Sequence, residues 1–278
     1  MIKLNVWLAV SCTLLIVSVA VFGQGLDVRT ATKTDRLDFG AGGTITITGA
    51  PDGTIRVTGS SKNEITITAE VSVSGASEAE FAELSRSIGF VTDESAMRVS
   101  IASTGSHNKF GLKKLPKKFP SRLLSLPFRI NYVISVPRYS DLEIDGGKGD
   151  VWVTDVEGRL RLNLVESNAS VEVLGGATQI MIGKGRLDIG FGSRGWRARS
   201  ADVQVGKGDI KVALPANASA EIDGVILRTG SIENAITELR PRDRKVTFTD
   251  KSLLGKIGVG GPTLKFTVAE GTLKISRL

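Results

Sequence analysis

Apolar and polar residues alternate strictly along two long stretches of this chain, residues 45–73 and 142–275. A period of two places successive side chains on opposite faces of a β-strand, so one face is buried and the other is in water. Glycine, or Asn, Asp and Ser, separates the runs and supplies the positive φ angles that tight turns need. The pattern predicts a series of short, half-buried strands. The expected inward-facing residues are Ile45, Ile47, Ile55, Val57, Ile65, Ile67, Val71, Val73, Leu142, Ile144, Val151, Val153, Leu160, Leu162, Leu164, Val171, Val173, Ile180, Ile182, Leu187, Ile189, Val203, Val205, Ile210, Val212, Leu264, Phe266, Val268, Leu273 and Ile275.

One short phrase occurs three times in the second stretch. Its copies read GKGDVWV at residues 147–153, GKGRLDI at 183–189 and GKGDIKV at 206–212. A repeated glycine turn followed by a strand is typical of stacked repeats, in which neighbouring copies bury each other's apolar faces. Strand centres lie about 7–11 residues apart, so strands two apart in sequence would be neighbours in the stack. The repeats favour an all-β, β-helix-like solenoid, and a β-sandwich, which shares the short, evenly spaced strands, is the alternative.

One helix interrupts the strands. Ser77 is placed to cap it, Glu80 follows three residues later as in a capping box, and Phe81, Leu84 and Ile88 form one apolar stripe. Gly89 ends the helical pattern. We expect this helix to cover one end or side of the sheets, because an open terminal strand is a template for aggregation.

The N-terminus predicts export. After Met1, Ile2 and Lys3, residues 4–22 are apolar or small and carry no charge, and small residues permit cleavage after Ala20 or Gly23. This is the pattern of a signal peptide over residues 1–23, which would leave a single β-repeat domain over residues 24–278. An uncleaved membrane anchor is the alternative, because the run approaches the length of a membrane span. Either way, the protein is expected in the periplasm, at the cell envelope or outside the cell.

Cysteine and histidine limit the chemistry. Cys12, the only cysteine, lies in the predicted signal peptide, and His107 is the only histidine. The remaining chain therefore has no disulfide framework, no thiol nucleophile, no Ser-His-Asp arrangement and no multi-histidine metal site. The sequence predicts no cofactor.

Positive charge is concentrated in one region. The formal net charge is +7, and residues 95–140 contain nine basic residues and no acidic one. Pro116, Pro120 and Pro127 forbid a long helix there, so we expect a basic loop insertion at about residues 102–128 and a strand again over residues 128–136. An anionic envelope surface (lipid or acidic glycan) or an envelope protein suits such a loop, whereas export argues against nucleic acid. A solvated loop without a partner is the alternative. The candidate binding residues are Lys109, Lys113, Lys114, Lys117, Lys118 and Arg122.

Trp152 departs from the pattern of the repeats. Val151 and Val153 are expected to face inward, which leaves Trp152 on the wet face, where the third copy has Lys211. An exposed indole stacks on a sugar ring or anchors a partner. Alternatively, a neighbouring loop such as the basic insertion covers it.

The repeats raise two further hypotheses, a calcium-binding site and an enzyme active site. Calcium-binding β-rolls use glycine-rich repeats that contain Asp, but here Lys148 occupies a position from which it would repel a cation. We therefore expect the glycines to form the turn and the aspartates to make local backbone hydrogen bonds. Enzymes that cut acidic polysaccharides need clustered carboxylates, and Asp150, Asp188 and Asp209 could line up on one face. The outer face of any stack must be polar, however. We therefore expect no catalysis.

From about residue 128 to the C-terminus the sequence resembles the bacterial putative-adhesin family of β-strand-repeat domains, a family of unknown function. The resemblance is carried by INYVISVP at residues 130–137, LEI at 142–144, the Gly-Lys-Gly-Asp turns, GDIKVALPANASA at 208–220 and GTLKI at 271–275. It implies an exported, envelope-associated β-solenoid without catalytic residues.

The expected function is a non-enzymatic adhesion or scaffold module. The alternative is an envelope-stress sensor or binding module that engages an anionic lipid, a glycan or a protein, and a polysaccharide-acting enzyme is the least favoured.

Overall fold

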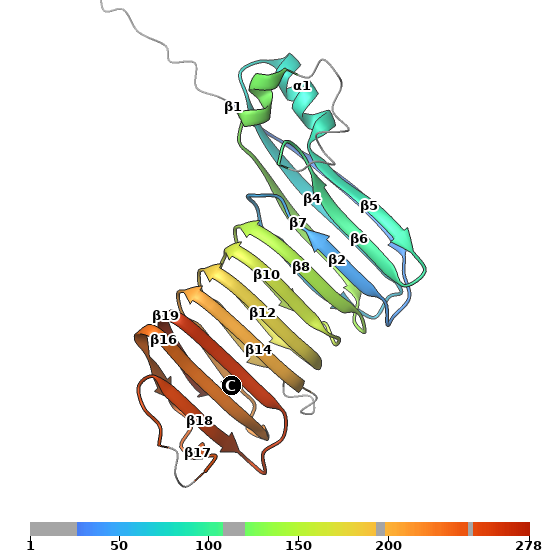
Figure 1. The fold of residues 1–278 in the computed structure, drawn as a ribbon. Coiled ribbons are helices and arrows are strands. Elements are labelled where there is room, and N and C mark those ends of the chain that lie inside the picture. The colour runs from blue at the N-terminus through green and yellow to red at the C-terminus, as the bar shows by residue number, and fades with distance from the viewer. Residues whose placement is uncertain (1–26, 108–119, 193–197, 244–246) are drawn as a thin grey trace, which may run out of the picture.

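The computed structural model describes residues 27–107, 120–192, 198–243 and 247–278, so the predicted signal peptide lies outside the described residues. In the described residues the protein is mostly β, with one α-helix and one short 3-10 helix, and the strands form one connected, mixed sheet that wraps around the core (Figure 1). The helices are α1 (Glu78–Ser87) and η1 (Ser121–Ser125), and the strands are β1 (Asp27–Asp38), β2 (Thr44–Thr48), β3 (Ile55–Ser60), β4 (Glu64–Gly75), β5 (Gly89–Ser95), β6 (Arg98–Thr104), β7 (Phe128–Pro137), β8 (Asp141–Lys148), β9 (Val151–Thr154), β10 (Leu160–Glu166), β11 (Ala169–Val173), β12 (Gly176–Lys184), β13 (Leu187–Phe191), β14 (Ala198–Lys207), β15 (Ile210–Leu214), β16 (Ala220–Asn234), β17 (Arg240–Pro241), β18 (Ser252–Ile257) and β19 (Thr263–Arg277).

Consecutive strands alternate between two ladders, and within each ladder the central strands are parallel. The first ladder runs β6, β2, β8, β10, β12, β14, β19 and β16, and the second runs β7, β3, β9, β11, β13, β15, β19 and β16. β19 and β16 each turn at a glycine with positive φ, Gly271 and Gly230, and belong to both ladders. Strands two apart in sequence are therefore neighbours, as the repeat spacing predicted. The antiparallel pairs lie at the ends: β1 with β4, β4 with β7, β5 with β6, and β18 with both β16 and β17. A β-sandwich is built from antiparallel sheets, so that alternative does not describe the central ladders.

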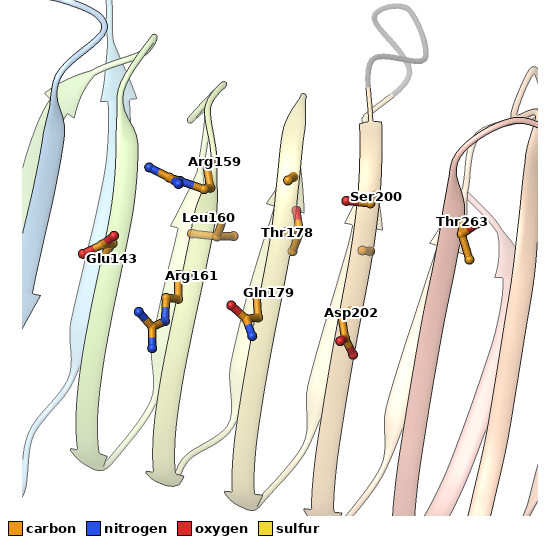
Figure 2. Close-up of a pocket in the computed structure, with 11 residues that line it drawn as sticks. Glu143, Arg159, Leu160, Arg161, Thr178, Gln179, Ser200, Asp202 and Thr263 are labelled. Carbon is orange, nitrogen blue, oxygen red and sulfur yellow. The ribbon is translucent and has the colours of Figure 1, made fainter.

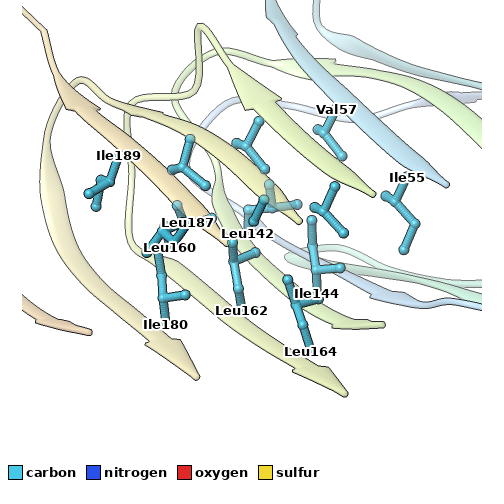
Figure 3. Packing of buried hydrophobic residues seen from close by; sticks show 14 of the residues in the cluster. Ile55, Val57, Leu142, Ile144, Leu160, Leu162, Leu164, Ile180, Leu187 and Ile189 are labelled. Atoms are coloured by element: carbon cyan, nitrogen blue, oxygen red, sulfur yellow. The ribbon is translucent and has the colours of Figure 1, made fainter. Parts of the chain in front are cut away.

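The two ladders bury one continuous apolar core between them (Figure 3). All the residues that the alternation predicted to face inward are buried. In β15, Ile210 and Val212 are buried whereas Lys211 is exposed, which confirms the inward and outward assignment of the repeat. Tyr132 is also in the core, where burial raises the pKa of its phenol to about 12 and its hydroxyl shares a hydrogen bond with Ser103 Oγ at 2.7 Å.

The glycine turns form a column at the corner where the chain passes from the first ladder to the second. Gly208 has φ = 134°, and a Cβ atom on it would lie 1.8 Å from the carbonyl oxygen of Gly185 in the neighbouring turn. The Gly208 N–H instead donates to the Glu270 carbonyl at 2.8 Å. Next to it, Asp209 Oδ1 accepts a hydrogen bond from the Thr272 N–H at 2.9 Å. At this corner glycine makes the turn, as expected, and Asp209 accepts from a backbone N–H of a neighbouring strand rather than from a local one.

Helix α1 lies at the end of the stack that carries β1 (Figure 1). Ser77 is its N-cap, and Ser77 Oγ accepts from the Glu80 N–H at 3.4 Å. Glu80 Oε2 reaches one residue further back than in a standard capping box and accepts from the Ala76 N–H at 2.8 Å. At the C-terminal end of the helix, Lys33 Nζ from β1 donates to the carbonyls of Ser85 (2.9 Å) and Ile88 (2.7 Å). A positive charge at this end stabilises the helix, because the C-terminal end of the helix dipole is negative. The sequence did not predict this contact.

Candidate functional site: the outer face of the second ladder

Five of the predicted binding residues, Lys109, Lys113, Lys114, Lys117 and Lys118, lie outside the described residues. Arg122 is described. It belongs to η1, where its guanidinium forms an ion pair with Glu80 of α1, and its neighbour Leu123 is buried. A hydrogen bond from the Ala76 N–H, and then the ion pair with Arg122, hold the pKa of Glu80 below its usual value. Arg122 thus has a partner inside the protein and ties the end of the predicted basic loop to α1.

Trp152 lies on the outer face, as the alternation predicted. It is on β9, flanked in register by Arg56 of β3 and Ser170 of β11, and it is partly buried. One cause of this burial is Arg56, whose guanidinium carbon lies over the indole, 4.4 Å from the ring centroid. A cation over an indole face is attracted by the electron-rich ring.

The surroundings of this pair combine an apolar contact with hydroxyl groups. Val133 of β7 is opposite Arg56 on the other side of β3 and is 55% exposed. Thr58 and Thr154 follow two residues along β3 and β9, and the Thr154 hydroxyl donates to Thr58 Oγ1 at 3.4 Å. We call these five residues the Trp152 platform. Arg56 contacts the Trp152 indole, and in the part of the chain that the structure describes no carboxylate forms an ion pair with it.

A polar cleft of about 460 Å³ opens on the outer face of the first ladder (Figure 2). Its central row crosses four strands in register and consists of Glu143, Arg161, Gln179 and Asp202. The two carboxylates are three strand spacings apart, which is about 14 Å. Glycosidases hold their two carboxyl groups about 5–9.5 Å apart. This cleft therefore does not have the arrangement that glycoside hydrolysis requires.

Asp150, Asp188 and Asp209 do not line up, contrary to the expectation on which the enzyme reading depended. Asp150 and Asp209 occupy equivalent corner positions, but the second copy has Arg186 there. Asp188 lies two residues further on, in the row of Trp152. Residues at adjacent corners interact with one another instead. Asn168 Nδ2 donates to Asp150 Oδ1 at 3.1 Å, and the Arg186 guanidinium lies 3.9 Å from Asp209 Oδ2. Among the described residues no three His, Cys, Asp or Glu side chains are grouped so as to hold a metal ion.

Arg56 is the platform residue that sequence reasoning missed. It sits on a strand of the first alternating stretch, whereas Trp152 belongs to the second. Alternation gives the face to which each side chain points, but it does not give the strand that lies next to it. The parallel pairing of β3 with β9 brings them together.

The structure has low similarity to several solved bacterial proteins. No family model matches the sequence, and no curated protein matches it. A putative cell adhesion protein from Clostridium sporogenes is 9% identical, with a TM-score of 0.48 over 91% of this chain and 100% of that one. A putative adhesin from Bacteroides fragilis is 12% identical (TM-score 0.31, 89% and 97% covered), and a putative lipid binding protein from Parabacteroides distasonis is 13% identical (TM-score 0.29, 89% and 96% covered). The adhesin names agree with the resemblance seen in the sequence. At such identities and TM-scores these matches assign no activity to the chain.

None of the helices in the described residues is long and apolar enough to cross a membrane.

Proposed function

We propose that this protein is an exported, non-enzymatic β-solenoid that acts as an adhesion or scaffold module at the cell envelope and binds acidic glycans through the Trp152 platform. The observation that carries the proposal is the stacked Arg56–Trp152 pair, in which a cation that has no carboxylate partner among the described residues lies over a partly exposed indole. The predicted signal peptide supports the location.

The solenoid form is supported by the regular step of the ladders. Leu142, Leu160 and Thr178 are neighbours in register, so one turn of the coil takes 18 residues at this point. Each turn contributes one strand to each ladder. Outer rows of side chains therefore repeat at the spacing of parallel strands, about 4.8 Å, and present a flat, extended surface to a polymer.

The platform offers each contact that an acidic sugar needs. The guanidinium of Arg56 matches a carboxylate in geometry and charge. The indole of Trp152 and the side chain of Val133 provide apolar surface for the C–H groups of a pyranose ring. The hydroxyls of Thr58 and Thr154 lie one position further along the same two strands and are placed for the hydroxyl groups of the sugar.

Trp152→Ala and Arg56→Gln should each weaken binding of an oligogalacturonate by at least tenfold. A tenfold loss is about 1.4 kcal/mol, which is modest for an aromatic or arginine anchor. Calorimetric titration of the protein without its predicted signal peptide measures it. Arg56→Gln should lose the preference for oligogalacturonate over a neutral maltooligosaccharide, whereas Trp152→Ala should weaken binding of both.

Lys211→Gln is the matched control, because it removes one positive charge from the same row, three strands from Trp152 in the second ladder. It should leave affinity unchanged within twofold. Equal losses in Arg56→Gln and Lys211→Gln, with none in Trp152→Ala, would mean that general charge, rather than the platform, binds the glycan. Wild-type affinity in both platform variants would reject the site.

A second candidate function is a binding or sensing module for an anionic surface through the basic loop. The observation that favours it is the segregation of charge, with nine basic residues and no acidic residue over residues 95–140. Each basic residue near an anionic bilayer contributes about 1 kcal/mol.

Replacement of Lys113, Lys114, Lys117 and Lys118 by Ser should abolish binding to vesicles that contain anionic phospholipid. The wild-type protein should bind at low salt and release as ionic strength rises, because the screening length falls to about 8 Å at 0.15 M. Co-sedimentation with vesicles measures both. Vesicle binding that does not depend on salt, or that is as strong in the quadruple variant as in the wild type, would show that these lysines form no binding site for the vesicle surface.

A further inference from the structure

An apolar groove of about 480 Å³ crosses the outer face of the first ladder. One row of its lining follows the strand register over β10, β12, β14 and β19 and ends at Leu227, which lies in a bulge of β16. Bulky residues stand at the two ends of this row, Val165 (65% exposed) and Leu227 (62% exposed). Three small residues lie between them: Gly183, Gly206 and Ala269. We call this feature the Val165–Leu227 groove.

The backbone explains why the floor is low. A Cβ atom on Gly183 would lie 2.6 Å from the carbonyl oxygen of Val165, and one on Gly206 would lie 2.5 Å from that of Gly183. Neither position accepts a side chain, so a channel remains above the backbone. Met181, an exposed methionine on β12, flanks it. Methionine adapts its shape to irregular apolar ligands.

The apolar character is out of place on this face. Outward positions of the same ladder are otherwise mainly charged or polar, as in the row of Glu143, Arg161 and Asp202 (Figure 2). A run of exposed apolar groups with a polar border marks a binding surface more often than isolated apolar residues do.

The dimensions fit one extended alkyl chain. Five strands spaced about 4.8 Å apart give a row about 19 Å long. A second copy of the protein is a poorer occupant, because a stable interface buries about 800 Å² on each partner, whereas this feature is one narrow channel.

Positive charge borders the groove. Lys184 and Lys207 follow Gly183 and Gly206 directly, and Arg228 follows Leu227. Lys184 is 2.6 Å from Glu166, and Arg228 is 3.3 Å from Glu270. Glu270 is also opposite Lys207 in register, but in the described part of the chain Lys207 forms no ion pair, so a bound anion could pair with it. The charge therefore complements a negative headgroup.

We propose that the Val165–Leu227 groove binds a long-chain fatty acid, with the alkyl chain lying in the groove and the carboxylate turned toward Lys207 on its border. This site lies on the ladder opposite the Trp152 platform and does not depend on glycan binding.

Calorimetric titration with palmitate, kept below its micellar concentration, tests the proposal on the protein without its predicted signal peptide. Ala269→Phe fills the channel, and Val165→Ser with Leu227→Ser removes its apolar ends. Each variant should weaken palmitate binding at least tenfold. Val259→Ser is the control, because Val259 is 97% exposed and outside the groove, and it should bind like wild type.

Ligand chemistry gives a second, independent readout. Each buried methylene contributes about 0.8 kcal/mol, roughly fourfold in affinity. Octanoate should therefore bind at least a hundredfold more weakly than palmitate, even if the chain is half buried. Lys207→Gln should weaken palmitate severalfold and leave palmityl alcohol unchanged.

Three results would overturn the proposal: no binding of palmitate by the wild-type protein, wild-type affinity in both groove variants, or binding to phosphatidylglycerol vesicles without binding of monomeric palmitate. Self-association that Leu227→Ser abolishes, with no palmitate binding, would show that the groove is instead an interface between copies of this chain.

Discussion

Ile210→Asp is expected to lower the free energy of unfolding by several kcal/mol, whereas Lys211→Asp should change it by less than about 0.5 kcal/mol. Ile210 is fully buried, with Leu187 and Leu273 opposite it in the neighbouring strands. An aspartate there would be an unpaired charge inside the stack. Lys211 is exposed between Asp188 and Lys274, so an aspartate in its place meets one repulsive and one attractive neighbour.

Denaturant unfolding of the two variants measures this difference. Because adjacent positions of one strand are compared, strand propensity and location are matched. Similar losses for both variants would contradict the assignment of inward and outward faces, and with it the stacking of the repeats.

Gly208→Ala is expected to be strongly destabilising, although it adds only one methyl group. Its φ of 134° is unfavourable for any residue with a Cβ, and the added atom would lie 1.8 Å from the carbonyl oxygen of Gly185. The turn must move, and the hydrogen bond from Gly208 N–H to Glu270 O is lost or distorted. We expect a loss of at least about 2 kcal/mol, since backbone strain and a disturbed hydrogen bond add together.

Gly190→Ala is the matched control in the same part of the stack. The nearest atom to a Cβ on Gly190 is 3.9 Å away, which is ordinary contact. This variant should be within about 1 kcal/mol of wild type, because alanine also restricts the unfolded chain. A small effect of Gly208→Ala, comparable to that of Gly190→Ala, would show that the corner column is not tightly packed.

The core was predictable because its signal is local. Alternation with a period of two decides which side chains face inward, and residues such as Ile144 and Val203 obey it without exception. The corner glycines were predictable for the same reason, since three copies of one phrase occur in the sequence. The cap made by Lys33 on α1 was not, because it joins β1 to a helix about 50 residues away.

The candidate sites were less predictable because they depend on register between distant strands. Trp152 was placed outward correctly, but Arg56 became its neighbour only through the pairing of β3 with β9. The expected alignment of three aspartates failed because Arg186 takes the corner place in the second copy, leaving Asp188 in another row. The Val165–Leu227 groove was missed, because Gly183 and Gly206 read as ordinary turn residues.

We propose that this protein binds acidic glycans and does not cut them. Incubation of the protein with a defined oligogalacturonate, followed by separation of bound from free ligand and mass measurement of both, tests it directly. We expect saturable binding that Trp152→Ala and Arg56→Gln weaken, with every recovered oligosaccharide at its original mass. Shortened or unsaturated products that require the folded protein, or no binding at all, would contradict the account.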